Sequence, residues 1–228
     1  MADDGSRVLF LRSASGDDPV NALWLFDPAN REESLVVDPE ELLVGADPDD
    51  LPAAELARRE RVRESGSGIV AYDALADLSR VCFALDGRVF LAEVIPPDTS
   101  PGDAEPPIRV VELPSTGDAF DPRLSPDGAA VAYVSGSSLR VTGTGGDHRL
   151  IGGSTPTVSW GSAEYIAAEE MGRTRGHWWS PDGSRLLVAR VDTAGVSEWW
   201  ISSPVDPTEA PRAIRYPAAG SVNAAVGL

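Results

Sequence analysis

The stretch Phe120-Asp-Pro-Arg-Leu-Ser-Pro-Asp-Gly128 and its counterpart His177-Trp-Trp-Ser-Pro-Asp-Gly183 contain the same four-residue turn, and this repeat decides the fold. A short apolar run follows each turn, Val131-Ala-Tyr-Val134 in the first copy and Leu186-Leu-Val-Ala189 in the second. Proline fixes φ at the second turn position, and Asp-Gly accepts the positive φ that reverses a chain between strands. The two turns start at positions 125 and 180, 55 residues apart, and related propeller blades run to roughly 40 to 50 residues.

The rest of the chain keeps the same rhythm of short apolar or alternating runs separated by Gly, Pro, Asp and Ser, which is typical of β-strands. These runs gather into four groups, at residues 8–37, 68–113, 130–151 and 178–216. The sequence therefore predicts an all-β fold, a partial β-propeller of about four blades, with residues 1–228 as the N-terminal part of one propeller domain. Because the groups are unequal and residues 222–228 contain no closing motif, we expect an incomplete ring.

Two segments interrupt the strand rhythm, and both are predicted to be short helical inserts. Residues 52–64 are mostly strong helix formers with Pro52 near the start. Residues 162–171 also favour a helix, with Ser162 as its N-cap and Glu164 in its first turn. We expect Tyr165 and Met171 to seat this second insert against its blade.

The composition excludes two classes of partner. The chain has 228 residues, of which 36 are acidic and 19 basic, so its formal net charge is -17. Binding to nucleic acid or to an anionic membrane requires clustered Lys and Arg, so neither partner is expected. An acidic surface attracts cationic ligands such as peptide ammonium groups, although it also serves solubility.

The remaining composition signals favour a soluble cytoplasmic protein without metal or cofactor. Cys82 is the only cysteine, so no disulfide forms within the chain. No secretory h-region and no apolar run of membrane-spanning length is present. His148, expected in a turn, and His177, expected at the start of a strand, lack a second His or Cys at ligand spacing. For the tryptophan pairs 178–179 and 199–200, we expect one ring of each to pack between blades.

The adjacent carboxylates Glu169 and Glu170 lie on the second predicted helix. Neighbours on a helix point about 100° apart, so both side chains can reach one small cation. A peptide α-amino group, with a pKa of about 7.7–8.0, is mostly protonated at neutral pH and can donate a charge-assisted hydrogen bond to each carboxylate. The alternative is an ordinary solvated helix face, since Arg173 follows three and four residues later. Spacing alone favours the solvated face.

Three segments, in the same order along the chain, closely resemble the N-terminal propeller region of dipeptidyl peptidase IV-like serine peptidases, of the prolyl oligopeptidase superfamily. The residues that carry the resemblance of the second insert are Glu164-Tyr165, Glu169-Glu170-Met171, Arg173, Gly176, Trp178-Trp179 and Pro181. Residues 59–73 are similar to an arginine-rich helix of the cytosolic branch, and Arg215 to Gly220 with Asn223 are similar to the linker beyond the blade.

The resemblance implies a function for the carboxylate pair. In the family, the two glutamates bind the free amino terminus of a peptide substrate, which points to Glu169 and Glu170 here. An arginine of the rim helix contacts the neighbouring backbone carbonyl, and either Arg59 or Arg63, one turn apart, can take this role. Pairing of these arginines with glutamates of their own helix is an equally good interpretation.

The resemblance also implies a part that this chain does not carry. The family's Ser-Asp-His triad lies in an α/β-hydrolase domain after the propeller. The sequence contains no Gly-x-Ser-x-Gly nucleophile elbow and only two histidines, His148 and His177. We therefore expect a substrate-gating propeller portion that is inactive alone. It would need the missing hydrolase domain as a partner to remove N-terminal dipeptides. The alternative function is a non-catalytic propeller that serves as a binding or scaffold module.

Overall fold

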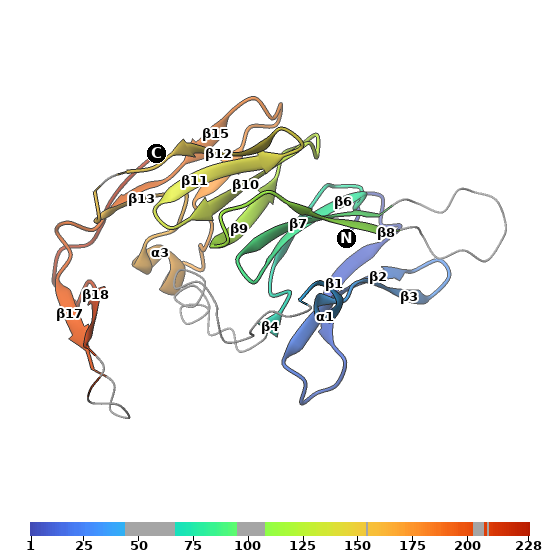
Figure 1. Cartoon of the computed structure of the whole chain (residues 1–228), viewed down its shortest axis with the longest axis horizontal. Coiled ribbons are helices and arrows are strands. Elements are labelled where there is room, and N and C mark those ends of the chain that lie inside the picture. The colour runs from blue at the N-terminus through green and yellow to red at the C-terminus, as the bar shows by residue number, and fades with distance from the viewer. Residues whose placement is uncertain (44–66, 95–107, 154, 203–207, 209) are drawn as a thin grey trace.

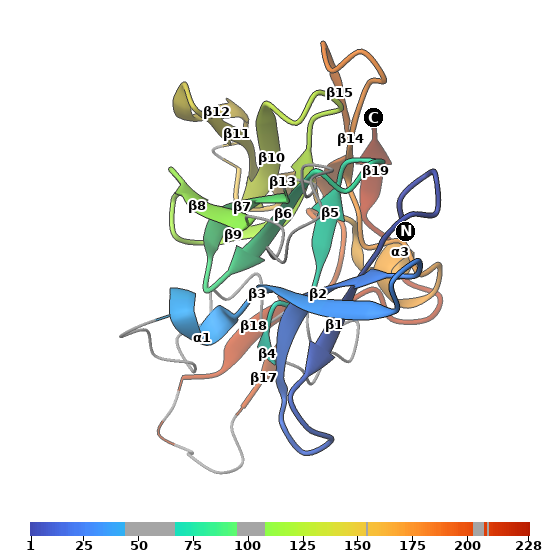
Figure 2. The ribbon, with the colours of Figure 1, turned by 90° about the vertical axis from the view of Figure 1, so that its right-hand side faces the viewer.

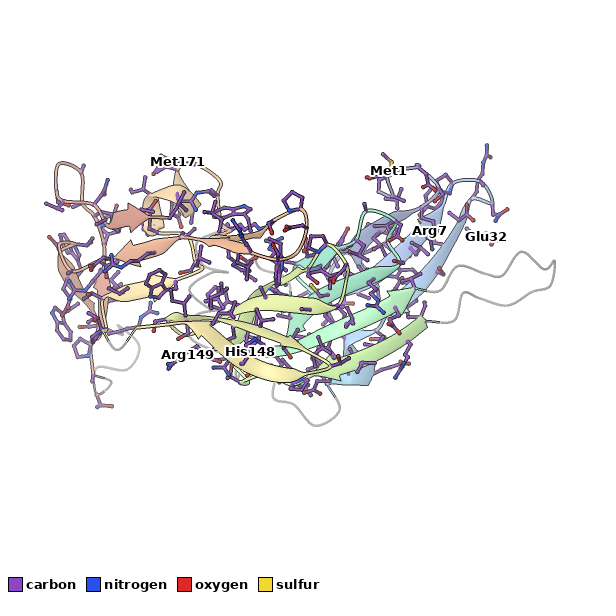
Figure 3. The ribbon with its side chains drawn as sticks, turned by 90° about the horizontal axis from the view of Figure 1, so that it is seen from above. Met1, Arg7, Glu32, His148, Arg149 and Met171 are labelled. Atoms are coloured by element: carbon purple, nitrogen blue, oxygen red, sulfur yellow. The ribbon has the colours of Figure 1, made fainter. Side chains whose placement is uncertain are left out.

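The computed structural model describes residues 1–43, 67–94, 108–153, 155–202, 208 and 210–228, and within them it is an all-β protein. Antiparallel sheets follow one another along the chain in an open row (Figure 1). Seen from above in Figure 3, Met171 lies at one end of this row and Glu32 at the other. The partial β-propeller predicted from the turn repeat is confirmed.

The first sheet contains β1 (Val8–Ser13), β2 (Val20–Asp27) and β3 (Glu32–Val37), with β4 (Ser67–Gly68) paired in parallel to β2. The short helix α1 (Pro39–Leu42) follows β3 and is capped by the Asp38 carboxylate, which accepts a hydrogen bond from the Glu40 amide. Figure 2 looks at the row from its N-terminal side and shows this sheet and α1 in front of the others.

Two regular four-stranded blades follow. The second sheet runs in the order β5 (Tyr72–Ala74), β6 (Arg80–Leu85), β7 (Arg88–Val94) and β8 (Ile108–Leu113). The third contains β9 (Ala119–Leu124), β10 (Ala130–Ser135), β11 (Ser138–Gly143) and β12 (Gly146–Ile151). His148 was expected in a turn, and this was wrong, because it pairs with Val141 as part of β12.

The fourth sheet is built from shorter pieces. Its pieces are a three-stranded part, in which β16 (Arg190–Asp192) pairs with β13 (Val158–Trp160) and β19 (Ala225–Gly227), and a two-stranded part, β14 (His177–Trp179) with β15 (Leu186–Val188). The helix α3 (Tyr165–Glu169) lies between β13 and β14 in the chain. We had expected residues 199–201 and 213–216 to be strands of this blade, and this was wrong. They form a separate hairpin, β17 (Glu198–Ile201) with β18 (Arg212–Arg215), which stands apart from the sheets in Figure 1.

The repeated turns close in the way their chemistry predicts. Gly128 and Gly183 have φ of +70° and +68°, and their amides donate to the carbonyls of Ser125 and Ser180 at 2.8 Å. In each turn the serine hydroxyl also donates to the carboxylate of the following aspartate. The turn between β6 and β7 is a tighter reversal without the Ser-Pro pair, with positive φ at both Asp86 and Gly87.

Apolar clusters fill the space between successive sheets. One joins the second and third sheets, and Tyr133 is among its fully buried members. Another joins the third sheet to the fourth, where Trp179, Leu186 and Val188 pack against it. The Trp179 indole also donates to the Arg123 carbonyl at 3.0 Å, so this residue has the packing role predicted for it. Trp199 and Trp200 are 49% and 66% exposed on the separate hairpin, so the same expectation was wrong for that pair.

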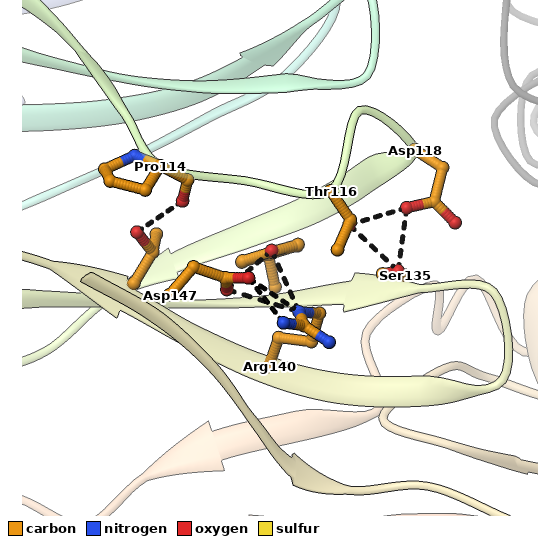
Figure 4. Close-up of polar contacts among 8 residues, drawn as sticks. Pro114, Thr116, Asp118, Ser135, Arg140 and Asp147 are labelled. Carbon is orange, nitrogen blue, oxygen red and sulfur yellow. Dashed lines mark hydrogen bonds and ion pairs between the residues drawn. The ribbon is translucent and has the colours of Figure 1, made fainter.

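A polar network supports the third blade from inside. The Tyr133 hydroxyl donates to the Asp147 carboxylate at 2.7 Å, and the Arg140 guanidinium donates to both oxygens of that carboxylate (Figure 4). Burial raises the pKa of Tyr133, so the phenol stays protonated and remains a donor. These contacts hold β10, β11 and β12 together. No helix in the described part of the chain is long and apolar enough to cross a bilayer.

Candidate functional site: an excursion from a blade strand

The segment with the carboxylate pair interrupts a strand of the fourth sheet: the chain leaves the strand and later returns to the same line. Trp160 at the end of β13 pairs with Arg190, and His177 at the start of β14 pairs with Val188. The two short strands therefore lie against neighbouring stretches of one partner, with Ala189 between them. We call residues 161–176, which lie between these two strands, the excursion; without them, β13 and β14 would form one continuous strand.

Ala189 closes the base of this excursion with its own backbone. Its amide donates to the Gly176 carbonyl at 2.8 Å, and its carbonyl accepts from the Gly161 amide at 2.9 Å. One residue further into the excursion on each side, Ser162 and Arg175 form an isolated antiparallel bridge. We call residues 161, 162, 175, 176 and 177, with Ala189, the neck of the excursion.

Glycine is required where the two sides of the neck meet. A β-carbon on Gly176 would lie 2.5 Å from the Ser162 carbonyl carbon and 2.6 Å from that of Gly161. Both obstacles are backbone atoms, so no side chain can move aside to relieve the clash. Gly161 adopts φ of +83°, which other residues rarely reach.

The helix within the excursion starts later than predicted. Glu164 caps α3, because its carboxylate accepts from the amides of Ile166 at 2.6 Å and Ala167 at 2.7 Å. The prediction of Ser162 as the N-cap was wrong: its hydroxyl contacts Ser159, three residues earlier. A glutamate placed directly before the first helical residue reaches the free amides and adds charge at the positive end of the helix dipole.

The helix also ends early. The Glu170 amide donates to Ile166, the Arg173 amide donates to Ala167, and Gly172 adopts φ of +63°. A left-handed residue with such a long-range backbone bond is a common way to end a helix. The exposed Met171, at 72%, does not seat the insert against the blade as expected. Tyr165 contacts the linker instead, with its ring 5.1 Å from the ring of Tyr216.

Glu169 and Glu170 lie at the C-terminal end of α3, as its last residue and its C-cap. Glu169 is half-buried and Glu170 is exposed. Within the described residues, no hydrogen bond or ion pair engages either carboxylate. The ion pair with Arg173 that the spacing allows is not formed, because this guanidinium donates to the Arg175 carbonyl at 2.9 Å. Two unpaired carboxylates beside the negative end of a helix attract positive charge.

The arginines expected to complete the site, Arg59 and Arg63, lie outside the described residues, as do Arg61 and the predicted helix at 52–64. A cavity of about 130 Å³ lies beside the start of α3, with Glu164, Tyr165 and Arg215 in its lining. In the part of the chain that the structure describes, no group of three His, Cys, Asp or Glu side chains could hold a metal ion.

A buried polar cluster underlies the neck, and no local pattern of residues predicts it. His177 is 0% exposed, its Nδ1 lies 2.9 Å from the Gly161 carbonyl oxygen, and Asp121 Oδ2 is 4.0 Å from the same nitrogen. The Arg175 Nε donates to the His177 carbonyl at 2.7 Å, and Arg123 pairs with Asp121. Burial lowers the pKa of His177, so the imidazole is neutral at neutral pH.

Known proteins share both the sequence and the fold of this region. The family described as "Dipeptidyl peptidase IV (DPP IV) N-terminal region" matches residues 91–228. The crystal structure of Porphyromonas gingivalis dipeptidyl peptidase 4 superposes with a TM-score of 0.59 at 16% sequence identity. That match covers 99% of this chain and 29% of the P. gingivalis chain, so this chain spans less than a third of its structural relative. At this identity the likeness concerns the fold.

Proposed function

Since this chain belongs to the family of dipeptidyl peptidase IV N-terminal regions, we propose that it is the propeller portion that binds the free amino terminus of a peptide substrate for a serine-type dipeptidyl peptidase. The observation that carries the proposal is the pair Glu169 and Glu170. The two residues are adjacent in the sequence, their carboxylates have no counter-ion among the described residues, and they lie on an excursion with a closed neck.

The chemistry of this pair matches a peptide ammonium group. The ammonium carries one positive charge and three N–H donors, so two carboxylates can each accept from it. The negative end of the α3 dipole adds to the attraction, and the net charge of -17 raises the local concentration of cationic ligands. The same field disfavours a peptide with an acidic or blocked amino terminus.

A fixed amino terminus determines where a peptide is cut. When the ammonium is held at one point, a set number of residues separates it from the catalytic serine, and the enzyme becomes an exopeptidase that releases dipeptides. In the intact cytoplasmic enzyme, the serine, aspartate and histidine of the hydrolase domain carry out acyl transfer, and Arg59 or Arg63 holds the first backbone carbonyl. The propeller gates access to that site.

Isothermal titration with a short peptide tests this function. The peptide is used in two forms, with a free amino terminus and with an N-acetyl group, against the 228-residue chain. We expect preferential binding of the free amine. A hydrogen bond to a charged group is worth about 1.5–3 kcal/mol, so Glu169→Gln and Glu170→Gln should each weaken that binding by roughly 10- to 100-fold.

Glu32→Gln is the matched control, because it removes the same charge from an exposed residue of β3 in the first sheet. It should leave the affinity within about twofold, since exposed charges more than about 10 Å apart are largely screened at 0.1 M salt. Equal affinity for the free and acetylated peptides would remove the ammonium-binding role. It would favour the scaffold module instead.

A further inference from the structure

We propose that His177 is a positioning residue for the Glu169–Glu170 pair: its buried side chain ties the two sides of the neck together and so fixes where the carboxylates lie. This inference rests on the proposed function and extends the site to a residue that does not touch the ligand. The supporting observations are the position of the ring, its hydrogen bond and its burial.

The His177 ring connects the two ends of the excursion directly. His177 follows Gly176, the last residue of the excursion, and its Nδ1 lies 2.9 Å from the carbonyl oxygen of Gly161, the first residue. Two further hydrogen bonds close the neck, and both run through the backbone of Ala189. The imidazole contact involves a side chain, so a substitution can remove it without altering the main chain.

The hydrogen bond fixes the protonation of the ring. A carbonyl oxygen only accepts, so the proton of the neutral imidazole is on Nδ1. The Nε2 atom then carries the lone pair, and it is buried without a hydrogen-bond partner in the described structure. Asp121 and Arg123 from β9 and Arg175 from the neck are the charged groups around this ring, and Asp73 from β5 pairs with Arg123.

The position of the carboxylates depends on the neck because both ends of the excursion join the blade through it. Between Gly161 and Gly176 the chain returns on itself through the Ser162–Arg175 bridge, and the turn after α3 is held by the amide and side chain of Arg173. These contacts lie within the excursion and make it a unit, and the Tyr165 ring adds a contact to Tyr216 of the linker at 5.1 Å. Rotation at the neck would carry Glu169 and Glu170 with it, and misplacement of a binding group by about 1 Å can reduce activity by about 100-fold.

Two substitutions of matched shape separate positioning from packing. In His177→Asn, the amide nitrogen lies at the position of Nδ1 and can still donate to Gly161. In His177→Leu, the side chain branches at the same carbon but has no donor. Both variants leave a similar gap in place of the ring, so their difference reports the hydrogen bond.

The first measurement is the ratio of affinities for the free and N-acetylated peptides, with the thermal midpoint of each variant. We expect His177→Asn to keep the ratio within about threefold and His177→Leu to lose about tenfold of it, because the leucine leaves the buried Gly161 carbonyl without this donor. If both variants lose the ratio in parallel with their thermal midpoints, the role is only structural and the proposal is overturned.

The second measurement needs no ligand. Hydrogen exchange at the Gly161 and Ala189 amides should be faster in His177→Leu than in His177→Asn, while the amides of β10 and β11 exchange equally. Equal exchange at the neck in both variants overturns the positioning role. If His177→Leu does not fold, His177→Gln replaces it, because its amide nitrogen corresponds to Nε2 and does not reach Gly161.

The two proposals fail in different ways. If the unaltered chain binds both peptide forms equally, the ammonium-binding function fails and this inference fails with it. If the unaltered chain prefers the free amine and His177→Leu prefers it to the same degree, the function stands and only the positioning role is wrong.

Discussion

Gly176 lies so close to Gly161 that a β-carbon at position 176 would be 2.6 Å from the carbonyl carbon and oxygen of residue 161. This close approach allows the chain to leave a strand, form a helix and return to the same point. The peptide-binding function proposed above depends on it, because Glu169 and Glu170 lie on the excursion between these two glycines.

Gly176→Ala should therefore separate the two sides of the neck. The added methyl group would clash with the backbone of residues 161 and 162. Overpacking of this kind typically destabilises a folded protein by about 1–3 kcal/mol. We expect the preference for a free-amine peptide to be lost, as measured by titration with the free and acetylated forms. Gly145→Ala is the control, because a β-carbon there has no atom within 4 Å. An unchanged peptide preference in Gly176→Ala would show that the neck geometry is unimportant.

The stability of the chain should depend on pH through His177. Burial lowers the pKa of this histidine from its ordinary value of 6.5, so below about that pH the unfolded chain binds more protons than the folded one. The free energy of unfolding should then fall as the pH drops below 6.5, down to the lowered pKa of the folded state. Urea unfolding of the unaltered chain and of His177→Asn, between pH 7.5 and 5.5, measures this. The variant should have the flatter profile, and identical slopes would contradict the prediction.

A second pH effect arises from the repeated turn. The Ser180 hydroxyl, the amide of Ser184 and its hydroxyl all donate to the Asp182 carboxylate and lower its pKa from 3.8 to about 2. This stabilisation is present above pH 3.8 and is lost as the pH falls through about 2. Asp182→Asn should reduce the acid dependence of the unfolding free energy in that window. Asp3→Asn, outside both turns, should not reproduce the effect.

The hydroxyl of Tyr133 should contribute more to stability than that of Tyr72. Tyr133 donates to the Asp147 carboxylate, whereas Tyr72 donates to the neutral backbone carbonyl of Leu9. Hydrogen bonds to charged groups are worth about 1.5–3 kcal/mol and neutral ones about 0.5–1.5 kcal/mol. Tyr133→Phe should therefore lower the free energy of unfolding more than Tyr72→Phe does, as measured by urea unfolding. Equal losses would indicate that Arg140 alone satisfies the Asp147 carboxylate.

The fold was predictable from local chemistry. The turns at Ser125 and Ser180 place Pro, Asp and Gly where a chain reversal needs them, and an apolar run follows each. Such signals involve only residues that are neighbours in the chain, so they can be recognised from a single sequence. The sheet to which β17 and β18 belong was not predictable in this way. Alternating runs identify strands, but the choice of partner depends on contacts between distant residues.

The candidate site was predictable only in part. The adjacency of Glu169 and Glu170 is visible in the sequence, and the resemblance gave it a function. The cap of α3 was predicted to be Ser162 because serine is a more common N-cap than glutamate. In the structure Glu164 directly precedes the helix, and its carboxylate accepts from the free amides. His177 was expected only to start a strand, because nothing local shows that its ring meets a carbonyl sixteen residues earlier.

The neck should make the proposed peptide-binding element interchangeable. Because β13 and β14 occupy one strand position on either side of Ala189, lengthening or replacing the loop above residues 161 and 176 leaves the register of the blade unchanged. A change of ligand preference at this element should therefore leave the sheets of the propeller intact. Protein engineers can graft foreign recognition peptides at this junction.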